Sequence, residues 1–81
     1  MQTEILTKQQ LAERQQRSIE SINTACSREP ESVPPFFKLG KHKNSPIRFR
    51  LSDVIAWETL KAEEAQQAIQ EEMARRSAYR L

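Results

Sequence analysis

The order of elements in this sequence predicts a mainly α-helical protein with a small β-hairpin. Two short amphipathic segments are separated by a tight turn, a proline-rich break follows, and an alternating basic stretch leads into a long helix-forming segment. This order is typical of a winged helix-turn-helix with a C-terminal helical extension. A chain of 81 residues holds at most one domain. We assign residues 1–60 to that domain and residues 61–81 to a helical tail.

The first helix is predicted from its cap. Thr7 and Gln10 are spaced as a capping box, in which the hydroxyl accepts from an early helix amide and the glutamine reaches back. A short helix is therefore expected from about Lys8 to Gln15. Leu11 and Ala12 are its inward residues.

A second helix follows after only a few residues. Ser18 is the N-cap candidate, and the helix is expected to run from about Ile19 to Ser27 or Arg28. Its inward face is predicted by the i, i+3, i+7 spacing of Ile19, Ile22 and Cys26. Cys26 is the sole cysteine, so an internal disulfide is excluded and the residue is read as a small buried apolar group.

A hairpin is predicted after Pro30, Pro34 and Pro35, which end the helical region. Residues 37–39 and 47–50 alternate around a turn that contains Gly40, Asn44 and Pro46. Period-two alternation predicts one packed face, made by Phe37, Leu39, Ile47 and Phe49. The other face would be basic and solvated, with Lys38, Arg48 and Arg50.

The third helix is expected to be capped by Ser52 and Asp53, with the acid at its positive end. An apolar stripe is predicted on it at Val54, Ile55, Trp57 and Leu60, with Trp57 as a core anchor. Good helix formers without Gly or Pro continue the helix past Leu60. A weak second stripe follows at Ala62, Ala65, Ile69 and Met73.

Charge separates the two halves of the chain. Residues 1–51 carry nine Lys or Arg against five acids, whereas residues 52–81 carry four against six. This asymmetry indicates an anionic partner for the front half, and double-stranded DNA is the expected one. One Gly, one His and one Cys cannot build a phosphate loop or a metal site, so we expect no enzyme, no cofactor and no metal.

The predicted DNA site has two parts. The second helix would enter the major groove, with its N-terminus at Ser18 near a phosphate. Residues turned outward from its apolar face are Arg17, Glu20, Ser21, Thr24 and Arg28. The hairpin would lie beside the duplex as a wing that contacts the backbone or the minor groove. Its candidate residues are Lys38, Lys41, His42, Lys43, Arg48 and Arg50.

A family resemblance is carried by "LTKQQLAERQQRS" followed by "PPFFKLGKHKNSPIRFRLSDVIAW", and most specifically by "LTKQQLAE", "FKLG" and "IRFRLSDVIAW". The stretch from about Ile5 to Leu60 resembles the AlpA-like prophage regulators and the excisionases with a MerR-type winged helix-turn-helix. The resemblance implies a recognition helix at residues 18–28 and a wing at residues 38–50. The chain departs from the family in having Gln16 and Arg17 where a Gly and an apolar residue are usual.

Three functions remain open from the residues. A prophage-type transcriptional regulator and an excisionase that bends attachment-site DNA use the same fold, and their protein partners would be RNA polymerase or an integrase. An adaptor that binds a protein through its helical tail belongs to another class. We hypothesise cooperative self-assembly on repeated sites. No apolar run reaches the ~20 residues of a membrane span and no signal peptide is seen, so we expect a cytoplasmic, nucleoid-associated protein without a membrane partner.

Overall fold

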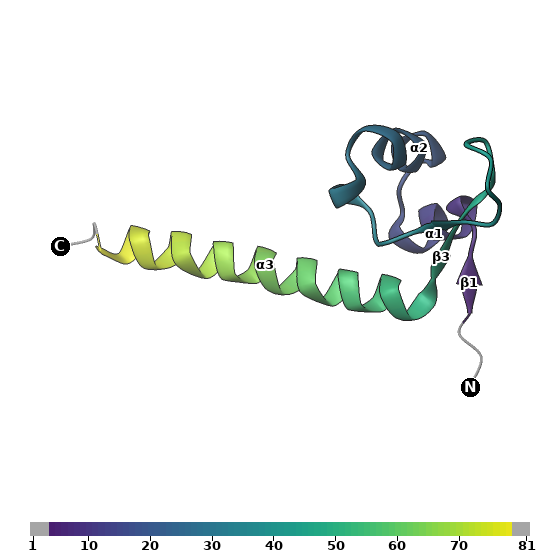
Figure 1. The fold of residues 1–81 in the computed structure, drawn as a ribbon. Helices are drawn as coiled ribbons and strands as arrows, with labels where there is room; N and C mark the ends of the chain where they lie inside the picture. Colours follow the sequence, from purple (N-terminus) through teal and green to yellow (C-terminus); the bar gives the residue numbers. More distant parts are fainter. Residues whose placement is uncertain (1–3, 79–81) are drawn as a thin grey trace.

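The computed structural model describes residues 4–78 and consists of a small packed domain from which one long helix projects (Figure 1). Helices predominate, and they accompany a small three-stranded antiparallel sheet. This architecture is compatible with a helix-turn-helix-like fold. The elements in chain order are β1 (Ile5–Leu6), α1 (Lys8–Gln15), α2 (Ile19–Arg28), the 3-10 helix η1 (Pro30–Ser32), β2 (Phe37–Lys38), β3 (Ile47–Arg50) and α3 (Leu51–Ala78).

Both predicted caps of the first two helices are confirmed. Gln10 donates its amide to the Thr7 hydroxyl at 3.1 Å, and the Thr7 amide donates to the Gln10 side chain at 2.8 Å. The Ser18 hydroxyl accepts from the Ser21 amide at 3.1 Å and starts α2. Between the helices, Gln16 has a φ of 55° and lies in the left-handed region. This residue supplies the sharp turn that a glycine usually provides.

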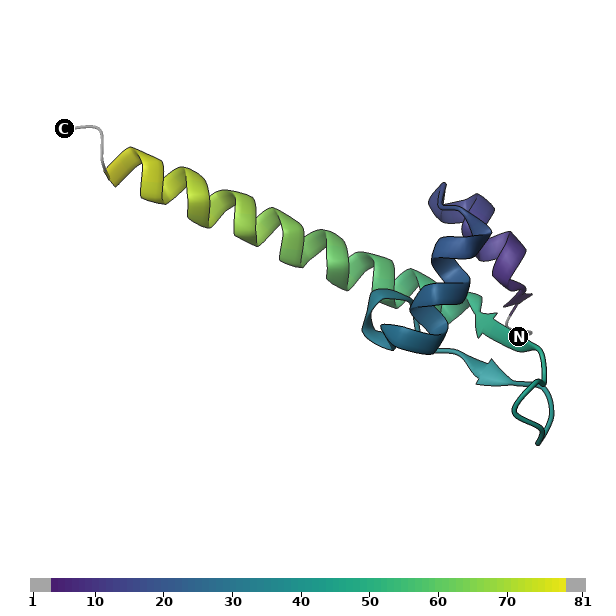
Figure 2. The ribbon, with the colours of Figure 1, turned by 90° about the horizontal axis from the view of Figure 1, so that it is seen from above.

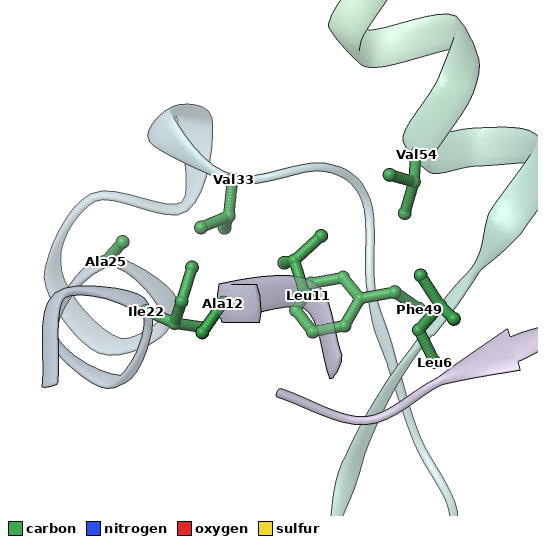
Figure 3. Close-up of a cluster of buried hydrophobic side chains, with 8 residues drawn as sticks. All are labelled: Leu6, Leu11, Ala12, Ile22, Ala25, Val33, Phe49 and Val54. Carbon is green, nitrogen blue, oxygen red and sulfur yellow. The ribbon is translucent and has the colours of Figure 1, made fainter. Parts of the chain in front are cut away.

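The core lies between α1, α2 and the sheet, and its side chains are shown in Figure 3. Its fully buried centre comprises Leu11, Ile22, Phe49 and Val54. Leu11 and Ala12 point inward as predicted. On α2 the predicted stripe is only partly right, because Ala25 is buried beside Ile22 whereas Ile19 and Cys26 are half-buried at its margins. The remaining core residues are Leu6 and Val33.

The sheet contains a strand that the sequence reading missed. β3 is central, and β1 and β2 pair with it on either side, both antiparallel. In β1, Leu6 lies opposite Phe49 and is buried. The Leu51 amide donates to the carbonyl of Glu4 at 2.8 Å, so the start of the chain is fastened to the junction of β3 and α3.

The predicted division of the hairpin into two faces is wrong for its first strand. Phe37 lies opposite Arg48, and residues directly opposite in an antiparallel pair share a face. Phe37 is therefore on the face of the arginines, and Lys38 shares the face of Ile47. The aromatic residue that packs inward is Phe36. The centres of the Phe36 and Phe49 rings are 5.9 Å apart, and the rings are arranged edge to face. Leu39, expected in the packed face, is 58% exposed.

The start of α3 also differs from the prediction. The helix follows β3 without a loop and begins at Leu51, so Ser52 and Asp53 belong to its first turn and Ser52 is not the cap. Asp53 still places a negative charge at the positive end of the helix. Of the predicted stripe only Val54 is buried. Ile55 and Leu60 are exposed, and Trp57 is half-buried with the Lys61 ammonium 5.7 Å from its ring, so it is not a core anchor.

The prediction that the helix continues past Leu60 is confirmed to Ala78, and residues 79–81 of the predicted tail lie outside the described residues. At a rise of 1.5 Å per residue its 28 residues span about 42 Å. In Figures 1 and 2 it leaves the domain as a single straight rod. The molecule therefore measures 60 × 32 × 21 Å along its principal axes, and the projecting helix accounts for the longest of these dimensions. Among the described residues, no helix has the length and apolar character needed to cross a membrane.

Candidate nucleic-acid interface

The outer face of α2 is polar and exposed. Three of the predicted contact residues on this helix, Glu20, Thr24 and Arg28, are exposed, while Ser21 is half-buried. The buried pair Ile22 and Ala25 sets this orientation. The helix thus presents short polar groups and one guanidinium, and such side chains can reach base edges or phosphates.

Arg17, predicted as an outward-facing DNA contact, is held by hydrogen bonds within the chain. Its guanidinium donates to the carbonyl of Ser32 at 3.0 Å and to the Ser21 hydroxyl at 3.1 Å. The Arg17 amide also bonds back to Ala12 at 2.9 Å, because the left-handed turn at Gln16 folds the chain onto α1. Arg17 is half-buried and fastens the start of α2 to η1, so it contributes to the fold rather than to an outward-facing contact surface.

A shallow hollow of about 380 Å³ lies along α2 and reaches the residues of η1. Its lining includes two carboxylates, Glu20 and Glu29, and a single guanidinium that is already hydrogen-bonded. The Ser18 hydroxyl satisfies the Ser21 amide within the chain. At this helix terminus the Ser21 amide is therefore not free to donate to a phosphate, as the prediction assumed. The carboxylates of Glu20 and Glu29 would also repel a phosphate there. The full lining is Arg17, Ser18, Glu20, Ser21, Thr24, Ala25, Glu29 and Ser32.

The hairpin turn carries the densest group of exposed cations. Lys38, Lys41 and Lys43 are all exposed, and the His42 side chain between Lys41 and Lys43 is exposed as well. No acid occurs between Phe36 and Arg50 in the sequence, so nothing within the hairpin neutralises them. The Lys38 ammonium donates to the carbonyl of Lys43 at 3.2 Å. The turn is thus a compact positive patch.

Hydrogen bonds hold this turn in one shape. The Leu39 amide donates to the carbonyl of Pro46 at 2.9 Å and closes the base of the turn. Within it, Ser45 donates its amide to His42 at 3.0 Å, and the His42 amide donates to the Ser45 hydroxyl at 3.1 Å. A Cβ atom at Gly40 would lie 2.7 Å from the Ser45 hydroxyl oxygen, so a larger residue there would force the Ser45 side chain, which accepts the His42 hydrogen bond, to move.

Arg48 and Arg50 have different surroundings from the lysines of the turn. They are on the outer face of the sheet, where the Arg50 guanidinium is 5.6 Å from the centre of the Phe37 ring. Arg48 is half-buried and donates to the carbonyl of Ile47 at 2.9 Å. The predicted grouping of Lys38 with these two arginines on one strand face is wrong, because the register places Lys38 on the opposite face.

The turn and α2 project on the same side of the domain. Figure 1 shows both rising from the side opposite α3, and Figure 2 shows the hairpin as a separate arm beyond the helices. The helix α2 and the hairpin arm therefore lie on the same side of the domain.

Two exposed residues in this region were missed by the sequence reading. Asn23 lies on the outer face of α2, and an asparagine amide can pair with adenine. The prediction placed Ile19, Ile22 and Cys26 on the inward face of α2. With Ile22 and Ala25 as the buried positions, Asn23 belongs to the outward face. Leu39 is an exposed apolar side chain beside the turn cations, and it was assigned to the core because strict alternation was assumed.

Three groups have shifted pKa values: Arg14 and Glu58, which lie outside α2 and the hairpin, and Cys26, which is half-buried on α2. The pKa of Glu58 is lowered, mainly by hydrogen bonds from the Arg14 guanidinium, which approach to 2.8 Å, and less by one from Gln15. The pKa of Arg14 is raised by the same pair. Burial raises the pKa of the Cys26 thiol, which disfavours the reactive thiolate. These three groups serve packing and the attachment of α1 to α3.

Comparisons of the chain with models of protein families, with curated proteins and with solved structures found no match.

Proposed function

We propose that the chain is a winged helix-turn-helix protein that binds double-stranded DNA. In this proposal α2 enters the major groove, and the hairpin turn lies against the backbone or the minor groove. Phosphate contacts from the turn would supply most of the affinity, whereas α2 would supply sequence preference.

The observation that carries the proposal is the cationic turn beside the polar helix face. Lys38, Lys41 and Lys43 are exposed and have no acid within the hairpin. The hairpin turn projects on the same side of the domain as α2. A solvated basic loop could serve solubility alone. A loop held in shape by its own hydrogen bonds, next to an exposed polar helix, is better suited to an extended anionic surface.

Base contacts would come from the exposed side chains of α2. Arg28 can donate two hydrogen bonds to guanine, and Asn23 can pair with adenine. Glu20 repels phosphate and is favourable only opposite a cytosine amine, so it would act mainly in discrimination between sequences. Thr24 can contact a phosphate or a thymine methyl group.

The resemblance to AlpA-like prophage regulators supports a role in transcriptional control of a mobile element. An excisionase is the second candidate, and one observation favours it. Leu39 is 58% exposed beside the cations, and apolar side chains that enter the minor groove unstack base steps and kink the duplex. A DNA-bending measurement with Leu39→Ser separates the two roles, because a lower bend angle at full occupancy supports the excisionase.

The test of DNA binding is a salt titration of duplex affinity by fluorescence anisotropy. Each of Lys41→Gln and Lys43→Gln should reduce the slope of log K against log salt by about 1, because each removes one phosphate contact. Arg75→Gln is the matched control, since it removes one exposed charge from α3 and should leave the slope unchanged.

Two results would contradict the proposal. One is the absence of binding to any duplex at low salt by a folded protein. The other is an equal loss of slope in the Arg75→Gln control, which would indicate attraction by net charge alone. A folded protein that binds no duplex would leave the adaptor, which binds a protein through its helical tail, as the remaining interpretation.

A further inference from the structure

Arg17 connects the start of α2 with the segment that follows the end of that helix. Its half-buried guanidinium donates to the Ser21 hydroxyl at 3.1 Å, in the first turn of α2, and to the carbonyl of Ser32 at 3.0 Å, in η1. A guanidinium is a planar fork whose N–H groups reach two acceptors in a fixed geometry, and an ammonium has no such fork. Arg17 therefore fixes the start of α2 relative to η1.

The segment that contains Ser32 is itself anchored to the sheet. The next residue, Val33, belongs to the buried core shown in Figure 3, and Pro34 is fully buried. Phe36 packs its ring against Phe49 of β3, and the chain then enters β2. The hydrogen bond from the guanidinium to η1 therefore connects α2 with the strands that carry the cationic turn.

The apolar contacts of α2 hold its middle more firmly than its start. The buried residues of this helix are Ile22 and Ala25, both near its centre, whereas Ile19 in the first turn is only half-buried. Contacts at the centre of a helix resist its displacement, but a contact at one end is needed to resist a change of tilt. Arg17 supplies that contact at the N-terminal end.

We infer that Arg17 is a positioning residue, which sets the sequence preference of α2 by holding its tilt relative to the hairpin turn and not by touching DNA. This role rests on the proposed binding of DNA. Hydrogen bonds to base edges tolerate only a narrow range of distance and angle, whereas phosphate contacts carry no sequence information. A helix that tilts relative to the turn would keep the phosphate contacts of the turn and lose part of its own base contacts.

The first test needs no DNA. Spin labels at Thr24→Cys and Lys43→Cys, with Cys26→Ala, report the distance between α2 and the turn by pulsed electron paramagnetic resonance. Arg17→Lys keeps the charge but loses the planar fork, so it should widen the distribution of this distance. Val54→Ala is the control, because it removes a buried side chain of α3 that lies away from α2 in Figure 3, and it should leave the width unchanged. An unchanged width in Arg17→Lys would overturn the inference whether or not the chain binds DNA.

The second test compares a duplex selected by the wild-type chain from a randomised pool with a random duplex. Arg17→Lys should weaken binding to the selected duplex about tenfold, a loss similar to that from one mismatched base pair, and should change binding to the random duplex by less than about twofold. Its salt slope should equal that of the wild type, because no phosphate contact is removed.

Two results of this comparison would overturn the inference. One is a salt slope reduced by about 1 in Arg17→Met with wild-type affinities in Arg17→Lys, which would indicate a direct phosphate contact. The other is an equal loss of preference in Val54→Ala, which would indicate general destabilisation. A wild-type chain that binds no duplex would contradict the proposed function and this role with it, whereas an unchanged preference in Arg17→Lys would overturn this role alone.

Discussion

The packed domain and the projecting part of α3 are stabilised by different interactions. Every fully buried side chain of the described residues lies at or before Val54, in elements that meet only when the chain folds. From Thr59 to Ser77 all side chains are exposed, and the interactions are those of one helix with itself. Examples are the contacts of Gln67 with Glu71 at 3.4 Å and of Arg76 with Glu72 at 2.9 Å.

This difference shows what each region requires from its sequence. The domain needs particular apolar residues at non-local contacts, because tertiary burial supplies its stability. The projecting helix needs only good helix formers. Packing within the chain does not constrain its exposed side chains. The same substitution should therefore have unequal effects in the two regions, and the predictions below use matched pairs to measure the inequality.

The largest difference is expected for deletion of an apolar side chain. Phe49→Ala should lower the free energy of unfolding by about 3–5 kcal/mol, because Phe49 is fully buried against the core and Phe36. Ile69→Ala should change it by no more than about 0.5 kcal/mol, because Ile69 is exposed. Urea titration followed by Trp57 fluorescence at low protein concentration measures both. A similar loss in the two variants would mean that α3 is packed within the monomer.

An intermediate difference is expected for loss of helix propensity. Ala12→Gly should cost about 2 kcal/mol, of which about 1 comes from propensity and the rest from a buried methyl group. Ala68→Gly has the same propensity cost but should fray α3 locally. The Ala68 variant should therefore lose ellipticity at 222 nm while the midpoint of Trp57 fluorescence stays unchanged. A shift of that midpoint would show that the two regions unfold together.

A gain of stability is expected at the turn between α1 and α2. Gln16 has a φ of 55°, and a residue with a Cβ atom in this region costs about 1 kcal/mol relative to glycine. Gln16→Gly should therefore raise the free energy of unfolding by about 1 kcal/mol. Gln16→Ala, which keeps the Cβ atom, should give no gain. Thermal unfolding of both variants measures the effect, and equal stability of the two would exclude strain as its source.

Local signals predicted the elements that local interactions build. The capping box at Thr7, the cap at Ser18 and the long run of helix formers predicted the bounds of α1 and α2 and the persistence of α3. β1 was missed because two residues show no periodicity, and its formation depends on pairing with β3, more than 40 residues away in the chain. The faces of the first hairpin strand were misassigned because Phe37 was taken as the inward residue, whereas Phe36 packs inward. A shift of one residue moves every side chain of a strand to the other face.

The candidate site divides along the same principle. The exposure of Lys41, His42 and Lys43 could be predicted, because a turn between two strands lies on the surface. The role of Arg17 could not, because its acceptor is the carbonyl of Ser32, 15 residues away on η1. Trp57 was misread because its place depends on where α3 begins, and that follows from the pairing of β3 rather than from a capping residue.

The smallest expected effect concerns the junction of the two regions and its pH dependence. Arg14 holds the pKa of Glu58 below its ordinary value, so this pair stabilises the fold above that value and its contribution is lost as pH falls through the lowered pKa. The pair is partly exposed, so solvent screening keeps its contribution to stability small. Glu58→Gln should lower stability at neutral pH and flatten its dependence on pH below about 4.5. Glu72→Gln removes a carboxylate that pairs only within α3, and should leave the domain's unfolding midpoint unchanged at every pH. If Glu72→Gln also flattened the profile, acid sensitivity would belong to the long helix, and the separation of the two regions at Glu58 would be wrong.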